Sequence, residues 1–159
     1  EAWAMIKERQ DLSFVIETKR EHRFFKALPG DWGDGYENVT ILCSVEIQRR
    51  ADDRIPAFLK LPVRHKGILC EPLLEKLVLD AYLKTGEIAQ VLCGGEQGAD
   101  ARVCDFAWVL ELMNQCVNCG VAFRFLRTGT FFRKGNRIYR IAEEEQEEQA
   151  RRAGVDYTP

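Results

Sequence analysis

Three glutamates, Glu46, Glu71 and Glu96, recur at intervals of 25 residues. Each follows a short apolar run, at the place where a buried strand would end. A single glutamate at such a place is usually a solvated loop residue, because connecting segments run over the protein surface. Three at matched positions instead favour a shared site, in which partly desolvated carboxylates could act as an acid or a base.

Basic and hydroxyl residues follow several of the same apolar runs. Lysine and arginine opposite carboxylates can bind the two charges of a zwitterionic ligand. We therefore predict a small-molecule site built from the polar and glycine residues at these strand ends. Its expected members are Thr18, Lys19, Arg20, Ser44, Glu46, Glu71, Gly94, Gly95, Glu96 and Arg127.

The string Gly94-Gly95-Glu96-Gln97-Gly98 is the most distinctive part of this set. Glycines after a buried strand allow a backbone to approach a ligand closely. The string is not a phosphate loop of the Lys-Ser/Thr type, and it lacks the spacing of the dinucleotide fingerprint. A tight turn between a strand and a helix explains it equally well.

The six cysteines predict neither a disulfide framework nor a metal site. Cys43, Cys70 and Cys93 lie inside apolar runs, where cysteine usually behaves as a small buried hydrophobe, so we expect reduced thiols. Cys116 and Cys119 form a CxxC pair at the end of a predicted helix. No second pair follows at a spacing typical of zinc sites.

The elements that would position the strand-end residues form a regular series. Each apolar run is followed by a stretch with helical character, and the interval of 25 residues matches one strand, one helix and two connections. The runs are continuously apolar, as in strands buried on both faces of a parallel sheet. We predict an α/β fold, a partial (β/α) barrel of about five parallel strands with covering helices. The strands are expected at residues 12–16, 39–45, 66–70, 88–93 and 121–126.

Two helices can be placed from their patterns. A short charged helix is expected at 47–59, limited by Pro56 and Pro62. An amphipathic helix is expected at 105–119, with Phe106, Val109, Leu110, Met113 and Val117 on one apolar stripe, and would end at Gly120. Residues 29–36 are rich in turn formers and predict a surface loop. We assign residues 1–142 to the barrel domain and residues 143–159 to a polar C-terminal helix or tail.

Composition limits the classes of function. The chain has 159 residues, 46% of them apolar, which is enough for one domain with a core. The net charge of -2 makes nucleic acid an unlikely general partner, so any such contact would have to be local. A basic set formed by Arg49, Arg50, Arg54, Arg64, His65 and Lys66 is explained more simply as a charged outer helix face. No run is long enough for a membrane span and no signal peptide is evident, so we expect a cytoplasmic protein.

An ordered set of short motifs resembles a phage-associated family of unassigned function. The motifs are Thr18-Lys19-Arg20, Ser44-Val45-Glu46, Cys70-Glu71-Pro72-Leu73-Leu74 and Gly94-Gly95-Glu96-Gln97-Gly98. The resemblance extends over nearly all of the chain up to about residue 140, and members of the family look like radical S-adenosylmethionine (SAM) barrels. The chain departs from the usual family pattern at Glu21, Ile47 and Leu126, where the family has Pro, Asn and Lys.

The resemblance implies SAM and a four-iron cluster for fuller family members, whose extra N-terminal segment carries three closely spaced cysteines. That segment is missing from this sequence, and none of the six cysteines has the spacing to replace it. We therefore expect no cofactor in this chain. The first hypothesis is the C-terminal part of a radical-SAM-like enzyme that is inactive alone. The alternative is a non-enzymatic binding module of a phage or mobile-element system.

Assembly follows from the predicted sheet. With five strands, the runs at 12–16 and 121–126 would be unpaired edges. The polar tail offers little apolar surface to cover them, so we expect a second copy of the chain to do so, which predicts a homodimer.

Overall fold

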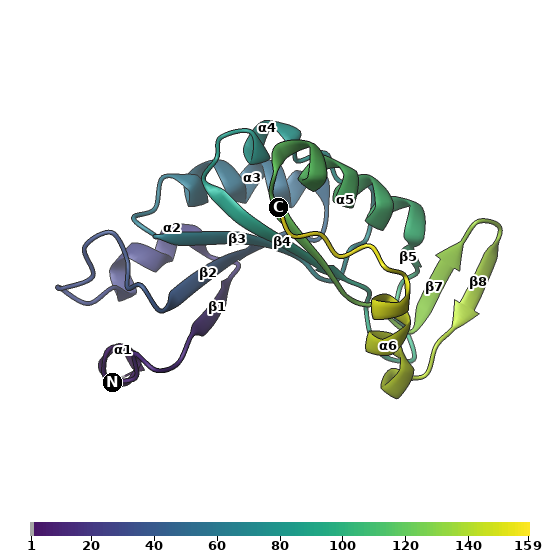
Figure 1. The fold of residues 1–159 in the computed structure, drawn as a ribbon, viewed down its shortest axis with the longest axis horizontal. Coiled ribbons are helices and arrows are strands. Elements are labelled where there is room, and N and C mark those ends of the chain that lie inside the picture. Colours follow the sequence, from purple (N-terminus) through teal and green to yellow (C-terminus); the bar gives the residue numbers. More distant parts are fainter. Residues whose placement is uncertain (1) are drawn as a thin grey trace.

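The computed structural model describes residues 2–159. Its main element is a sheet of five parallel strands in the order β1-β2-β3-β4-β6 (Figure 1). The five apolar runs of the sequence are therefore neighbouring strands, and the predicted α/β fold of the partial-barrel type is confirmed. The strands are β1 (Phe14–Thr18), β2 (Val39–Ser44), β3 (His65–Cys70), β4 (Ile88–Gly94) and β6 (Ala122–Arg127).

The central strands are buried on both faces, as their continuous apolar character predicts. In β2 and in β3, five of six residues are buried, so these strands lie in the middle of the core. Cys70 and Cys93 face each other in register, and Cys43 belongs to the same core cluster. Burial raises the pKa of Cys43 to about 12 and the pKa values of the other two thiols well above 9. The three cysteines are therefore buried protonated thiols.

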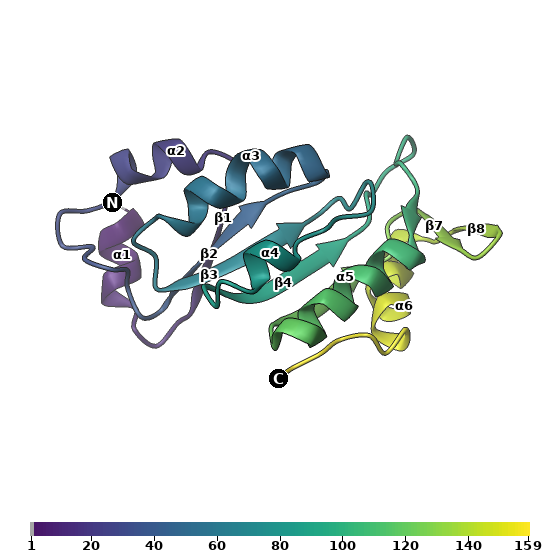
Figure 2. The same ribbon diagram turned by 90° about the horizontal axis from the view of Figure 1, so that it is seen from above.

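Three helices cover the convex side of the curved sheet (Figures 1 and 2). The first, α3 (Gln48–Leu59), matches its expected position but continues through Pro56, which lies in the final turns, where a missing N–H removes only one helical hydrogen bond. The second, α4 (Asp80–Leu83), is a single turn, so the connection from β3 to β4 is mostly irregular.

The third covering helix is α5 (Phe106–Cys119). Asp105 caps it by accepting a hydrogen bond from the Ala107 N–H, and Gly120 ends it with a φ of 64°. The fully buried face consists of Val109, Leu112 and Cys116, whereas Val117, which we expected on that face, is 39% exposed. The predicted helix is correct and its buried stripe is rotated.

The first part of the chain packs through aromatic rings. Helices α1 (Ala2–Glu8) and α2 (Glu21–Phe24) are followed by η1 (Phe25–Ala27) and by the predicted loop. That loop is not wholly superficial, because Trp32 is only 4% exposed and donates a hydrogen bond to the Pro62 carbonyl. The Trp32 ring contacts those of Trp3 and Phe24. Glu1, the first residue of the predicted domain, lies outside the described residues.

A second, small sheet was not predicted. It has the order β5-β7-β8 and consists of β5 (Cys104–Asp105), β7 (Phe131–Lys134) and β8 (Arg137–Arg140). Strands β7 and β8 form an antiparallel hairpin that turns at Gly135, where φ is 59°. The hairpin extends away from the five-stranded sheet (Figures 1 and 2).

The C-terminal tail covers the β6 edge, contrary to our expectation. After η2 (Glu143–Glu145) the chain forms α6 (Gln146–Arg152), in which Gln146 and Ala150 are 1% exposed. Tyr157 then forms an antiparallel bridge with Phe123 of β6. A polar segment can therefore close an edge with backbone hydrogen bonds and a few small buried groups.

Among residues 2–159, no helix combines the length and the apolar character needed to cross a bilayer.

Candidate functional site

The carboxyl ends of the parallel strands meet at one side of the sheet, which we call the rim. Two adjoining hollows open there, and they share Pro72 and Glu96. The Glu46 hollow, of about 450 Å³, is lined mainly by Lys19, Glu46, Arg50, Pro72, Glu96 and Arg102. The Glu71 hollow, of about 240 Å³, is lined by Glu71, Pro72, Gly95, Glu96, Gln97 and Arg127.

Glu46 is held between two cations. Lys19 Nζ lies 2.7 Å from its Oε1, and the guanidinium of Arg54 lies 3.2 Å from its Oε2. Burial raises the pKa of Glu46, but the hydrogen bond from Lys19 and the two positive charges outweigh it, so the pKa is lowered overall. Glu46 is therefore a carboxylate at neutral pH, and it connects the end of β1 to that of β2.

Glu71 lies across the backbone of Gly94 and reaches Arg127, whose Nε is 2.8 Å from Oε1. A Cβ at position 94 would lie 2.7 Å from that same oxygen, so glycine lets the ion pair form without displacing the end of the Glu71 side chain. Burial raises the pKa of Glu71, Arg127 lowers it, and the charges of Glu17 and Glu147 raise it further. The net shift is upward, which makes Glu71 the rim carboxylate most suited to accept a proton.

Glu96 binds Arg102 through both of its oxygens, at 2.8 and 2.7 Å. It also accepts a hydrogen bond from the Arg102 backbone N–H. The side-chain hydrogen bond from Arg102 is the main reason that the pKa of Glu96 falls to about 2. These contacts close the loop that follows β4, so Glu96 both fixes that loop and presents its charge to both hollows.

Gly95 is explained by packing between two backbones. A Cβ there would lie 2.1 Å from the carbonyl oxygen of Thr128 and 2.8 Å from the Cα of Gly129. Gly129 itself has a φ of 79° and faces Gly95 from the other side. Close packing of two backbone segments, which neither reading of the glycine string anticipated, therefore accounts for Gly95. The chain after β4 is a loop and β5, followed only then by α5.

Six of the ten predicted site residues line the two hollows, and four do not. Thr18 accepts a hydrogen bond from the Arg20 N–H in a local turn, and Arg20 is exposed. Ser44 is fully buried, and its hydroxyl has no partner among the described residues. Gly94 lies beneath Glu71. Ser44 was expected at the rim, but it is a strand residue covered by its neighbours.

Three cations near the rim were missed from the sequence: Arg50, Arg54 and Arg102. Arg54 is not on the outer helix face where we placed it, because its side chain is 14% exposed and also donates to the Ser44 carbonyl at 2.5 Å. Lys66, from the same basic set, is also buried and donates to the Val63 carbonyl. An arginine two turns along the helix from a strand-end glutamate was the available signal.

The cysteines do not fit an iron–sulfur cluster. All six are free thiols, all except Cys119 are buried, and none of them lines the two rim hollows. Within residues 2–159, no three His, Cys, Asp or Glu side chains are arranged to hold a metal ion.

Comparison with known proteins identifies the family but no activity. No curated protein and no solved structure matches the chain. One family model does match, over residues 1–157, and its description is "Protein of unknown function (DUF5131)". A match of that extent covers both the five-stranded sheet and the tail, so the chain belongs to the DUF5131 family.

Proposed function

We propose that the rim binds a small ligand that carries both a carboxylate and an ammonium group. The Glu46 hollow carries this proposal, because its wall combines two carboxylates with three cations. In this proposal Lys19 and Arg102, which also hold Glu46 and Glu96, would meet a ligand carboxylate, and Glu46 would meet an ammonium group. Its volume of about 450 Å³ lies within the range of small-molecule sites.

We further propose that the chain is the barrel part of a radical-SAM-like enzyme and is inactive alone. The amino-acid end of SAM is a zwitterion of the kind that the rim suits. None of the six cysteines fits a four-iron cluster, so in this proposal the cluster would have to be held by protein other than the described residues. The residues of this chain would hold and orient the ligand, and Glu71 would hold a proton beside it.

Calorimetric titration tests the binding proposal with three probes: SAM, methionine and 5′-deoxyadenosine. We expect SAM and methionine to bind in the millimolar range and deoxyadenosine, which lacks the zwitterion, not to bind. At a ligand concentration equal to Kd the stabilisation is only about 0.4 kcal/mol, so the thermal shift should be about 1–2 °C.

Charge-removing variants locate the site. Glu46→Gln and Arg102→Gln should each weaken the binding of methionine about tenfold, because each removes one of the charges that meet the ligand. Lys60→Gln, an exposed change outside the rim, is the matched control. The proposal would be contradicted if deoxyadenosine bound as tightly as SAM and methionine, or if both rim variants bound methionine as tightly as the unchanged chain.

The alternative, a binding module without catalysis, is favoured by one observation. Glu46 and Glu96 both have lowered pKa values because cations hold them, so neither is suited to donate a proton near neutral pH. A module of this kind should bind methionine with the same affinity from pH 6 to pH 8. An affinity that changes with the protonation of Glu71, and loses this change in Glu71→Gln, would favour the enzyme.

A further inference from the structure

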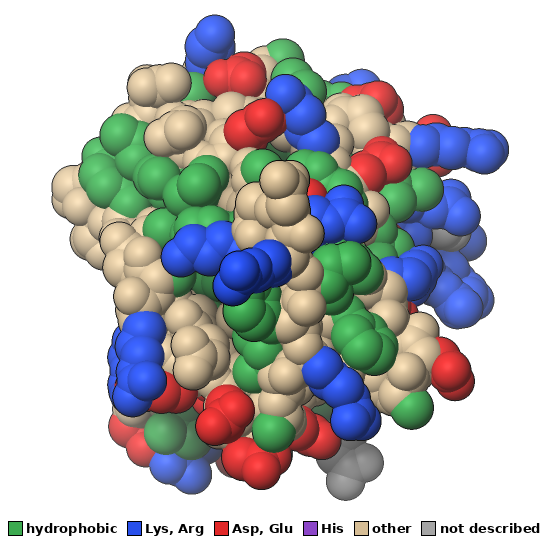
Figure 3. All heavy atoms as spheres, turned by 90° about the vertical axis from the view of Figure 1, so that its right-hand side faces the viewer, with side chains coloured by type: hydrophobic (Ala, Val, Ile, Leu, Met, Phe, Trp, Pro, Cys, Tyr) green, Lys and Arg blue, Asp and Glu red, His purple; other side chains and the backbone are tan. Residues whose placement is uncertain are grey.

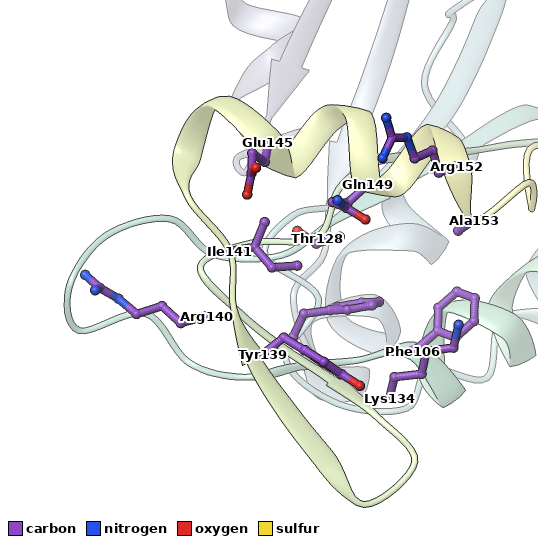
Figure 4. Close-up of a pocket in the computed structure, with 11 residues that line it drawn as sticks. Phe106, Thr128, Lys134, Tyr139, Arg140, Ile141, Glu145, Gln149, Arg152 and Ala153 are labelled. Atoms are coloured by element: carbon purple, nitrogen blue, oxygen red, sulfur yellow. The ribbon is translucent and has the colours of Figure 1, made fainter.

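A third hollow lies apart from the rim hollows, between the β7–β8 hairpin, the start of α5 and the helix α6 (Figure 4). We call it the hairpin hollow. Its volume is about 400 Å³, and none of its lining residues lines the Glu46 or Glu71 hollows. Such a volume is that of a small-molecule site.

One side of the hairpin hollow is aromatic. The rings of Phe106 and Phe132 are 5.7 Å apart and both line it, and Phe132 stacks on Phe125 at 5.9 Å behind them. Tyr139 extends this surface to the mouth of the hollow, where it is 45% exposed. Its hydroxyl has no hydrogen-bond partner among the described residues. An exposed ring of this kind can receive another flat ring by stacking.

The hairpin is strongly basic. Residues 131–140 contain Arg133, Lys134, Arg137 and Arg140 and no acidic residue. Arg133 pairs with Asp105, but the other three have no acidic partner within 4 Å among the described residues. Lys134 Nζ instead lies 5.5 Å from the centre of the Phe106 ring. Figure 3 shows this side of the molecule, where Lys and Arg side chains surround apolar patches.

The opposite wall of the hollow is polar. Glu145 and Gln149 lie there in Figure 4, facing the hairpin across Ile141. Arg152 also lines this wall, but Glu148 already binds its guanidinium at 2.8 Å. Glu145 is thus the single carboxylate of the lining, against the unpaired Lys134 and Arg140. A ligand that fits must combine a flat ring, polar edge groups and negative charge.

We propose that the hairpin hollow binds a nucleotide unit. The base stacks on Tyr139, and its polar edge meets Gln149 and Glu145. Its phosphate lies against Lys134, whose charge is otherwise unbalanced. A free nucleotide and one unit of a single-stranded nucleic acid share this chemistry, and the test distinguishes them. This local basic surface is compatible with a chain whose overall charge is -2.

The test is a fluorescence anisotropy titration of the full chain with a labelled single-stranded octanucleotide, and with unlabelled AMP as competitor. Tyr139→Ala should weaken binding about tenfold, because stacking on an aromatic ring is lost, and Tyr139→Phe should retain it. Lys134→Gln should weaken binding severalfold and reduce its salt dependence, because it removes the charge that meets the phosphate. Lys84→Gln, an exposed change at the end of α4, is the charge-matched control.

The outcomes separate the two sources. If AMP competes at the concentration at which the octanucleotide itself binds, the ligand is a free nucleotide. If the octanucleotide binds at least tenfold more tightly and salt weakens it steeply, the ligand is a single strand. The proposal is overturned if neither the octanucleotide nor AMP binds with a Kd below 1 mM. It is also overturned if Tyr139→Ala leaves the affinity unchanged. So would an acidic, phenylalanine-rich peptide that binds through Tyr139 where neither nucleotide probe does.

Discussion

The two edges of the five-stranded sheet differ in whether their backbone groups are paired. At the β6 edge, residues 155–157 pair with the strand: Tyr157 exchanges two backbone hydrogen bonds with Phe123, and Asp156 accepts one from the Phe125 N–H. At the β1 edge, no strand or bridge from residues 2–159 pairs with the outer side. The Phe14 N–H donates to the Asn38 carbonyl, on the β2 side of β1. Since successive N–H groups of a strand point to opposite sides, those of Val15 and Glu17 point outward. An edge is therefore closed by backbone pairing more than by apolar content.

The two sides also differ in their rim carboxylates. Near β1, Glu46 is held by Lys19 and Arg54 and has a lowered pKa. Near β6, burial raises the pKa of Glu71 more than its single arginine lowers it, and the negative charges of Glu17 and of Glu147 on α6 raise it further. The tail that closes the β6 edge thus also influences the charge state of the rim.

Removal of the edge cover should have the largest effect. A chain that ends at Gly154 loses Val155, which is 8% exposed, and the three hydrogen bonds of residues 156 and 157 to β6. We expect the free energy of unfolding to fall by about 3 kcal/mol, from the lost burial and about 0.5–1 kcal/mol per hydrogen bond. Urea denaturation measures this change.

Two milder variants refine that experiment. Removal of the exposed residues 158–159 alone should leave stability unchanged. Asp156→Ala should cost about 1 kcal/mol, because the Phe125 N–H loses its acceptor, and Asp156→Asn should retain it. If the chain ending at Gly154 were as stable as the full chain, the tail would not be the cover of β6.

The open β1 edge should affect assembly more than stability. We propose that a second copy pairs with it, and we expect a dimer by light scattering at micromolar concentration. Val15 is 60% exposed on β1, so Val15→Lys should change the unfolding free energy by less than about 0.5 kcal/mol but shift the mass toward the monomer. Val78→Lys, at a residue 55% exposed outside the sheet, is the matched control and should remain dimeric. A wild-type monomer, or dissociation in both variants, would contradict the proposal.

The smallest expected effect is a difference in pH dependence. Glu96 has a pKa near 2 in the folded chain, so its stabilising contribution is complete above its ordinary value of 4.5 and is lost as the pH falls toward 2. Glu71 has a raised pKa, so the folded chain loses stability as the pH rises from 4.5 through that value. In urea denaturation from pH 3 to pH 7, the fall of the unfolding free energy in acid should therefore be smaller in Glu96→Gln, and its fall at rising pH should be smaller in Glu71→Gln.

Salt adds a second distinction. Arg102, the partner of Glu96, is 61% exposed, whereas Arg127, the partner of Glu71, is 27% exposed. Added salt should therefore reduce the Glu96 contribution more than the Glu71 contribution. If the unfolding free energy of the two variants depended on pH in the same way, the two carboxylates would have the same environment.

The sequence by itself determined the parallel sheet, the helices α3 and α5, and the gathering of Glu46, Glu71 and Glu96 at one rim. Continuous apolar runs predict these strands because a strand buried on both faces leaves no room for polar side chains. The glutamate spacing predicts a shared rim because parallel strands end on the same side of the sheet. The position of Gly120 was sufficient to end α5, because that residue needs a positive φ.

Only the tertiary structure decided which partners complete these features. Arg54 and Arg102 reach the rim carboxylates because the helix and the loop that carry them fold back toward it, which no local pattern encodes. The basic hairpin and the tail that pairs with β6 have few apolar residues and no strong period, so their structure depends on long-range contacts. Ser44 was placed at the rim from its position in the sequence, but the packing of its neighbours buries it. Residue type and spacing fix what a strand end can carry, and the folding of distant segments against it decides what each charge meets.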